Sequence, residues 1–334
     1  MKNSSASALS RIQRMRGFSL VELMVALTIG LILVAGLMAL VVGNIQGYGE
    51  LSKSSYQVES ARFSAQVLRD ELSMAGYYGD LSFNSVIGTA ALPSDADLKS
   101  TAKDKIVARY GVFIEGRNDV TTGESRYALT PGVSFRAGTD VLLVRRASSR
   151  AVLPGSMSSD YLYVGGDHAT AHFMTSTESL APYTFLNDEK FENVRRYVER
   201  LIYVANCSVC SGAEADTIPT LKMVELRNGS WSSPMSLVEG IEDLQLEYGI
   251  DSDGDGFPDE FVDEPASGEW RDVAAVRFHL LVRNLDESRV GILPEKTYVL
   301  GSKMVTPNDD FKRHVYSMTV RLRNAAERRE DDDV

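Results

Sequence analysis

The sequence predicts an α+β protein in which one long N-terminal helix packs on a mostly antiparallel β-sheet head. Two observations lead to this class. An apolar segment near the N-terminus continues as an amphipathic pattern with helical spacing. The remainder of the chain carries short segments in which apolar and polar residues alternate, as they do in strands with one solvated face.

The apolar segment covers residues 18–43 and contains Glu22 as its only charged residue. At ~1.5 Å per residue, a helix of this length is long enough to cross a bilayer. The preceding residues, 1–16, contain Lys and Arg but no acid. Positive charge on this side predicts that the N-terminus stays in the cytoplasm and that the rest of the chain lies across the membrane.

The helical pattern continues to about residue 75. Its apolar members recur at intervals of three, four and seven residues: Leu51, Val58, Ala61, Ala65, Leu68, Leu72 and Ala75. We expect a single helix over about residues 18–75, with Gly76 as its stop signal. The second half of this helix, residues 44–75, should cover a sheet.

Strands are expected mainly in the second half of the chain. Residues 76–132 are rich in Gly, Ser, Asp and Thr and predict irregular structure with edge strands. Strand patterns follow at residues 140–146, 197–204, 221–226, 276–282 and 316–322. In the last two, apolar residues alternate with polar residues such as Arg277 and Arg321, which predicts one solvated face for each strand.

Composition argues against several functions. Lys and Arg number 35 and Asp and Glu 46, for a formal net charge of −11, whereas proteins bind phosphate backbones mainly through basic residues. The mean hydropathy of −0.13 argues against several membrane spans. No nucleotide-binding or hydrolase motif is present in a suitable context, so the sequence gives no basis for an enzyme or for catalytic residues.

Glu22 is the most informative residue of the apolar segment, because a carboxylate inside an apolar helix costs several kcal/mol unless it is paired. The run Gly17-Phe18-Ser19-Leu20-Val21-Glu22 before a long apolar helix resembles the class III signal of type IV prepilins and pseudopilins. This resemblance implies cleavage by a prepilin peptidase after Gly17 and methylation of the new amino group of Phe18. It also implies that Glu22 pairs with the Phe18 amine of a neighbouring subunit during assembly.

Later segments resemble the PilW type of minor pilin: residues 237–256, residues 273–284, and the closing strand at residues 321–324. The resemblance implies the type IV pilin fold and a non-enzymatic subunit that helps to initiate pilus assembly at or near the pilus tip. Implied partners are other minor pilins, the major pilin, a tip adhesin, the prepilin peptidase and the assembly platform. The implied location is the inner membrane before assembly and the cell-surface pilus afterwards, with roles in twitching motility and adhesion.

Two alternatives remain open. A minor pseudopilin of a type II secretion system shares the N-terminal motif. A pilin stalk can also tether a surface binding module or an enzyme, and a concave polar pocket within residues 80–190 would favour that alternative.

The resemblance also divides the chain. Residues 1–17 are expected to be a cleaved leader, 18–43 and 44–75 the membrane-spanning and amphipathic halves of the helix, and 76–324 the β-rich head. Residues 325–334 form a charged tail.

An acidic run at residues 251–259 is the densest group of metal-ligand side chains. Asp251, Asp253 and Asp255 alternate with residues that include two glycines, which permit a tight turn around one hard cation. The twelfth position of an EF-hand would be Glu, and here it is Val262, so this loop is not an EF-hand. It resembles the acidic loops of extracellular calcium modules, and we expect structural calcium with Asp259 and then Asp263 completing the ligand set. The alternative is a solvated acidic turn.

Cys207 and Cys210 are the two cysteines of the chain. A zinc site would need a second pair of ligands, and the histidines are remote in sequence. A redox pair would open a helix, whereas this pair follows a predicted strand. We therefore expect a structural disulfide outside the cytoplasm.

Overall fold

The computed structural model describes residues 17–79, 111–121, 133–166, 171–177, 194–227, 230–288 and 295–324. The predicted leader up to residue 16 and the charged tail lie outside the described residues, as does much of the region from 80 to 190. The chain divides into two compact units, Met1–Lys53 and Ser54–Val334, which we describe separately.

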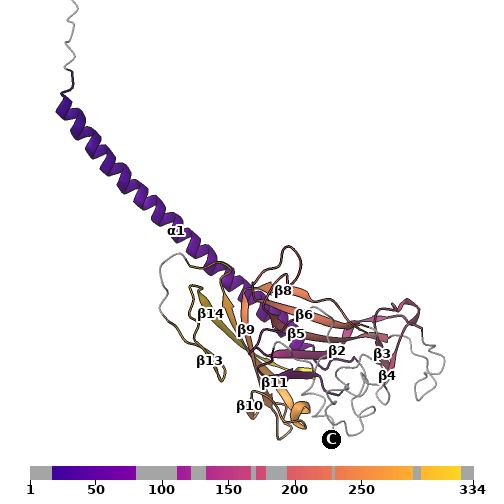
Figure 1. Cartoon of the computed structure of the whole chain (residues 1–334). Helices are drawn as coiled ribbons and strands as arrows, with labels where there is room; N and C mark the ends of the chain where they lie inside the picture. The colour runs from indigo at the N-terminus through magenta and orange to yellow at the C-terminus, as the bar shows by residue number, and fades with distance from the viewer. Residues whose placement is uncertain are drawn as a thin grey trace, which may run out of the picture. The chain divides into compact units, whose positions relative to one another are not determined.

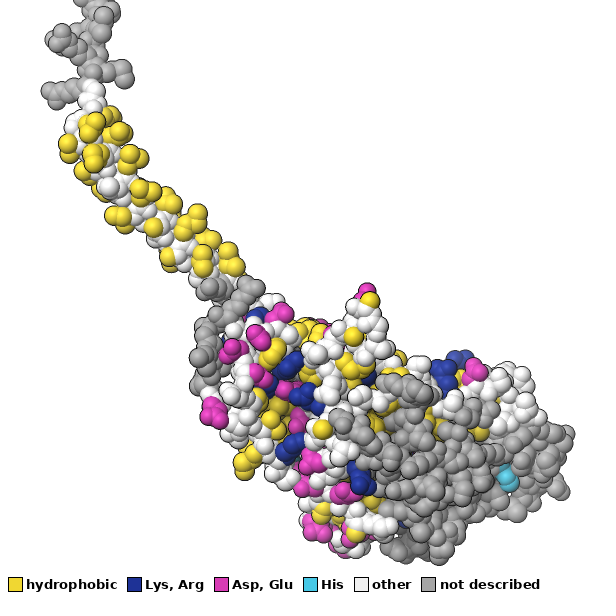
Figure 2. Space-filling model, in the orientation of Figure 1, with side chains coloured by type: hydrophobic (Ala, Val, Ile, Leu, Met, Phe, Trp, Pro, Cys, Tyr) yellow, Lys and Arg dark blue, Asp and Glu magenta, His cyan; other side chains and the backbone are white. Residues whose placement is uncertain are grey.

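The first unit contains the start of helix α1 (Leu20–Ser73). Its apolar side chains are exposed along the helix, as Figure 2 shows in yellow. By length and composition, this helix is able to cross a membrane. The predicted helix is confirmed, with each end about two residues inside the expected bounds.

In the second unit, α1 contributes a buried stripe with helical spacing. Its members are Gln57, Ser60, Ala61, Ser64, Ala65, Leu68 and Leu72. Small side chains occupy the middle of this stripe, and Gln57 Nε2 donates a hydrogen bond to the carbonyl oxygen of Lys312 at 2.5 Å. The prediction of an apolar stripe from Leu51 and Val58 was wrong at its start, because these side chains are 65% and 43% exposed.

The large sheet has eight strands, and all pairings among its described strands are antiparallel (Figure 1). Its strands are β1 (Ile114–Arg117), β2 (Val141–Val152), β3 (Tyr163–Gly166), β4 (Ala171–Met174), β5 (Val194–Ala205), β6 (Thr220–Arg227), β7 (Ser230–Trp231) and β8 (Met235–Glu239). β5 is central: it pairs with β2 along one edge and with β3 and β6 along the other. The edge strand predicted before residue 132 is present as β1.

The second sheet has four antiparallel strands in the order β10-β9-β11-β14. Its members are β9 (Ile241–Ile250), β10 (Glu260–Val262), β11 (Val273–Arg283) and β14 (Arg313–Arg321). A hairpin of β12 (Tyr298–Leu300) and β13 (Lys303–Val305) and two short 3-10 helices, Pro154–Ser156 and Glu269–Arg271, complete the described elements. The predicted α+β class with a mostly antiparallel head is confirmed.

β11 departs from prediction because the face expected to be polar is only partly solvated, with the Arg277 side chain 36% exposed. His279 and Leu281, on the face expected to be polar, are buried. The hairpin turn at Gly301 covers this face so closely that a Cβ there would lie 3.3 Å from atoms of both Glu247 and His279. The alternation predicted for the last strand is confirmed, since Ser317, Thr319 and Arg321 are exposed while Val320 is buried.

One charged cluster is fully buried in the large sheet. Arg145 on β2 lies 2.9 Å from a Glu115 oxygen and 3.3 Å from a Glu199 oxygen, and all three side chains have no exposed surface. Arg145 Nη1 also donates to the carbonyl oxygen of Val112, and Tyr197 Oη donates to Glu199. Burial alone would lower the pKa of Arg145, but the charges of Glu199 and Glu115 outweigh burial and raise it.

A second ionic group ties α1 to the same sheet. Glu71 of α1 pairs with Arg146 on β2 at 3.3 Å and with Arg200 on β5. Arg200 in turn lies 2.7 Å from Glu225 on β6. These half-buried side chains connect the last turns of the helix to three adjacent strands, which fixes the helix against the sheet.

Candidate functional site

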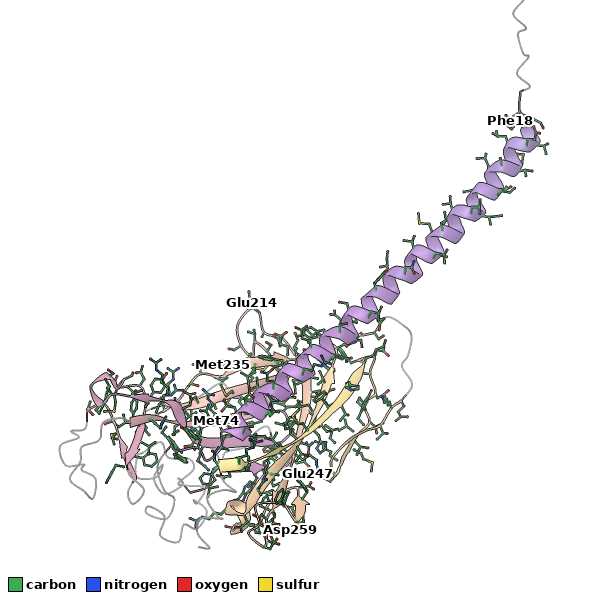
Figure 3. All side chains as sticks on the ribbon, turned by 180° about the vertical axis from the view of Figure 1, so that it is seen from behind. Phe18, Met74, Glu214, Met235, Glu247 and Asp259 are labelled. Atoms are coloured by element: carbon green, nitrogen blue, oxygen red, sulfur yellow. A yellow bond between two sulfur atoms is a disulfide. The ribbon has the colours of Figure 1, made fainter. Side chains whose placement is uncertain are left out.

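Gly17 and Phe18 lie directly before α1, and both are exposed; Figure 3 labels Phe18 at this end of the helix. Ser19 is the N-cap residue: its Oγ accepts a hydrogen bond from the backbone N–H of Val21 at 3.2 Å. Glu22 returns the interaction, because its Oε2 accepts the backbone N–H of Ser19 at 2.9 Å. The two residues form a capping box, which satisfies two N–H groups that a helix start leaves unpaired.

The capping box gives Glu22 a local function that our sequence analysis missed, although its Ser-x-x-Glu spacing is visible in the sequence. The carboxylate acts at the residue next to Phe18, where an acid is also favoured by the positive end of the helix dipole. The expected pairing with the amine of another subunit needs a second chain and stays a prediction.

The acidic loop joins β9 to β10, so its ends are held at adjacent positions in the second sheet. Asp251, Asp253 and Asp259 each place one carboxylate oxygen within 4.8 Å of the other two. Ligands of one calcium lie at 2.3–2.6 Å from it, so two of them are at most ~5 Å apart. Three of the predicted ligands therefore have a spacing that suits a single calcium ion.

Asp251 also shapes the loop. Its side chain is buried, and its two oxygens accept the backbone N–H groups of Gly254 and Gly256 at 2.9 and 3.0 Å. Both glycines have φ near +80°, a conformation in which other residues are strained. The fold of the loop thus depends on Asp251 and on the two glycines together.

Two other predicted ligands lie outside this group. Asp255 Oδ1 accepts the backbone N–H of Phe257 at 2.8 Å, and Asp263 Oδ2 accepts the hydroxyl of Ser302 at 2.7 Å. The structure therefore brings Asp251, Asp253 and Asp259 together, and it does not bring Asp255 or Asp263 to them. Figure 3 labels Asp259 in this loop.

Cys207 and Cys210 form a disulfide, as predicted, in the loop after β5. Asp216 closes this loop by accepting the backbone N–H groups of Ser208 and Val209 at 2.7 and 2.8 Å. Burial opposes ionisation of Asp216, but the backbone hydrogen bonds prevail and lower its pKa. Hydrogen bonds within the loop thus fix its shape. The two cysteines lie in a loop after a strand, whereas a redox pair normally opens a helix.

Ser317, His279 and Glu247 form a row across β14, β11 and β9. His279 Nδ1 lies 2.7 Å from Ser317 Oγ, and its Nε2 lies 2.9 Å from Glu247 Oε2. Our sequence analysis missed this row because its members lie on three separate strands and no local motif links them. Such a row stabilises strand pairing, and we assign it no chemical role.

Asp140 is a buried acid where the large sheet meets the second sheet. Its Oδ1 accepts the backbone N–H of Asp119 at 2.9 Å, and its Oδ2 accepts that of Leu246 at 2.7 Å. Burial raises the pKa of Asp140 to about 7, helped by the nearby charges of Asp119 and Asp243 and opposed by the two hydrogen bonds.

This raised pKa predicts a pH-dependent stability. An unfolded Asp titrates near pH 4, so between about pH 4 and 7 the folded state holds a proton that the unfolded state has lost. The contribution is fully present below pH 4 and is lost as the pH rises through 7. Asp140→Asn, which mimics the neutral acid, should remove this dependence of the unfolding free energy on pH. In the wild type the dependence amounts to up to roughly 4 kcal/mol, at ~1.4 kcal/mol per pKa unit.

Urea unfolding of the wild type and of Asp140→Asn at pH 4.5 and 7.5 measures the effect. Asp70→Asn, on an exposed helix position, is the control and should keep the wild-type slope. Equal slopes for Asp140→Asn and the wild type would contradict the assignment.

Parts of the chain near each end match models of known protein families. Residues 203–324 match the family model described as Type IV Pilus-assembly protein W, and residues 12–38 match the prokaryotic N-terminal methylation motif. A solved type IV-like pilin from Thermus thermophilus aligns with 80% of this chain and 96% of its own, at 12% identity and a TM-score of 0.37. A search of curated proteins found no match.

A methylation motif at the start of a long apolar helix, followed by an antiparallel β-rich head, makes this chain similar to type IV prepilins. Within that class, this chain is similar to PilW-type minor pilins over its last strands. The resemblance predicted from the sequence is confirmed.

Proposed function

We propose that this protein is a PilW-type minor pilin, a structural subunit that helps to initiate assembly of a type IV pilus and sits at or near its tip. The observation that carries the proposal is the coexistence of the pilus-assembly match over residues 203–324 with the methylation motif over residues 12–38. The first match favours a pilus over a type II secretion system. Partners in this role are other minor pilins, the major pilin, a tip adhesin and the assembly platform.

The N-terminal geometry supports a specific route into the filament. Cleavage between Gly17 and Phe18 by prepilin peptidase creates a charged amine on Phe18, which is then methylated. In the apolar interior of a filament that amine needs an anion, and Glu22 of the neighbouring subunit supplies it. Before assembly, the apolar half of α1 holds the protein in the inner membrane with its head in the periplasm.

Three variants test this route in a strain that lacks the chromosomal copy. Gly17→Ala should leave the protein unprocessed. Glu22→Gln keeps an oxygen for the capping box but removes the charge, whereas Glu22→Ala removes both and also costs about 1 kcal/mol of helix capping. We expect both Glu22 variants to be processed normally but to be lost from sheared pili, as measured by immunoblots of cells and of the sheared fraction.

The Glu22→Gln variant separates charge pairing from helix capping. Normal incorporation of Glu22→Gln together with loss of Glu22→Ala would show that the cap, not the ion pair, is required. Normal piliation with all three variants would reject the proposed function.

We also propose that the loop between β9 and β10 binds structural calcium through Asp251, Asp253 and Asp259. The spacing of their oxygens, within 4.8 Å, supports one cation, and without it three carboxylates would repel each other. Calcium would then stabilise the end of the second sheet to which the loop is attached.

A further inference from the structure

A pocket of about 580 Å³ lies beside the end of β2 and the start of β3, within the region that the PilW match does not cover. Arg150, Arg196, Tyr161 and Tyr163 line it, together with three serines and the short apolar stretch 151–153. None of these lining residues is acidic. In a protein with a net charge of −11, this is a locally basic concavity of a size typical for small ligands.

A wide bulge in β2 builds one wall of this pocket. Ala147 pairs with Tyr197, but the next pair joins Ala151 to Arg195, so β2 carries two extra residues between them. The guanidinium of Arg195 donates to the carbonyl oxygens of Ser148 and Ser149, at 3.3 and 2.6 Å. The bulge is therefore held in place, and two of its carbonyl groups already accept hydrogen bonds.

The two arginines of the lining differ in their partners. Arg196 lies 4.6 Å from the ring centroid of Tyr161 and pairs with Glu225 at 3.2 Å. Arg227 approaches the same ring at 5.8 Å, so Tyr161 is fixed by two cations. Arg150 is exposed, and its guanidinium has no hydrogen-bond or ion-pair partner among the described residues. Arg150 is thus the group available to an anion.

We infer that this pocket binds an acidic sugar, a hexuronic acid unit of an extracellular polysaccharide. Arg150 can bind the carboxylate through two parallel hydrogen bonds. The hydroxyls of Ser148, Ser158 and Tyr163 each accept one backbone N–H group, and their own protons can be donated to ring oxygens of the sugar. An acidic peptide is the weaker candidate, because extended peptides bind through free backbone groups and the bulge carbonyls already accept from Arg195. This binding would be a further function beyond filament assembly, namely attachment to a polyanionic surface.

Calorimetric titration of the full chain in detergent micelles tests the inference, with a chelator present so that the acidic loop does not contribute. The probes are trigalacturonate, the neutral sugar galactotriose, and a tetraglutamate peptide. We expect trigalacturonate to bind, its affinity to fall at high salt, and Arg150→Gln to weaken it at least tenfold. Arg62→Gln removes the same charge from an exposed helix position and should leave binding unchanged.

Arg150 has no described side-chain partner, so its variant should fold, which an unchanged melting temperature would verify. Failure of trigalacturonate to bind, or equal binding by the wild type and Arg150→Gln, would overturn the inference. If galactotriose bound as tightly as trigalacturonate, the pocket would not recognise the carboxylate, and the inference of an acidic sugar would be overturned. Tighter binding of tetraglutamate would assign the pocket to an acidic peptide instead of a sugar. If Arg196→Gln, which also releases Tyr161, were the only variant to weaken binding, Arg150 would be excluded as the ligand group.

Discussion

Arg145→Met should destabilise the head by about 3–5 kcal/mol, because it leaves the carboxylates of Glu115 and Glu199 buried without their cation. That is a large share of the ~5–15 kcal/mol by which a typical domain is stable. Arg145→Lys should recover little of the loss. The native guanidinium donates through three nitrogens to three acceptors, whereas an ammonium group is a point charge on a flexible stem.

The triple variant Arg145→Met, Glu115→Gln, Glu199→Gln separates charge from packing. It removes the unpaired charges, and buried ion pairs are often replaced by neutral groups at little cost, so it should regain most of the lost stability. Thermal unfolding of the full chain in detergent compares the three variants with the wild type. A melting temperature for Arg145→Met within a degree of the wild type would show that the two carboxylates are neutralised by other means.

Much of the architecture was predictable because it depends on periodicity. The long helix, the five strand patterns and the antiparallel head follow from spacings of 3.6 and 2 residues, and the structure contains them. The errors arise where a partner remote in sequence changes the environment. Gln57, at the start of the helix stripe, is buried because its amide meets the backbone at Lys312, and the hairpin turn at Gly301 covers part of the β11 face that was expected to be solvated.

The candidate sites could likewise be predicted where their residues are close in sequence, and not where they come from separate strands. The disulfide and the N-terminal motif depend on residues a few positions apart, so local spacing was enough to predict them. The acidic loop was predicted as a unit, but alternation alone gave Asp255 as a ligand, whereas its carboxylate accepts the backbone N–H of Phe257 and lies outside the group. The Arg145 cluster and the pocket beside the β2 bulge join separate strands, and no local pattern marks them.

Added calcium should raise the melting temperature of the full chain, and a chelator should lower it again. If the loop binds calcium only when folded, metal at ~100 times its dissociation constant adds ~2.7 kcal/mol to the free energy of unfolding. Asp253→Asn and Asp259→Asn should abolish the difference, since each keeps an acceptor oxygen for its loop hydrogen bond and loses the charge. Asp251 is unsuitable for this test because its buried carboxylate also holds Gly254 and Gly256.

Asp255→Asn is the matched control for these variants. It makes the same change in the same loop at a residue outside the carboxylate group, so its calcium response should remain that of the wild type. Magnesium should substitute poorly, because it demands a stricter octahedral shell at shorter distances than three converging carboxylates of a glycine-containing turn provide. A melting curve that ignores both calcium and chelator would identify the loop as an acidic turn whose shape comes from Asp251 and the glycines alone. A response lost in Asp255→Asn but kept in Asp253→Asn would place the cation elsewhere in the loop, on a ligand set that includes Asp255 and leaves out Asp253.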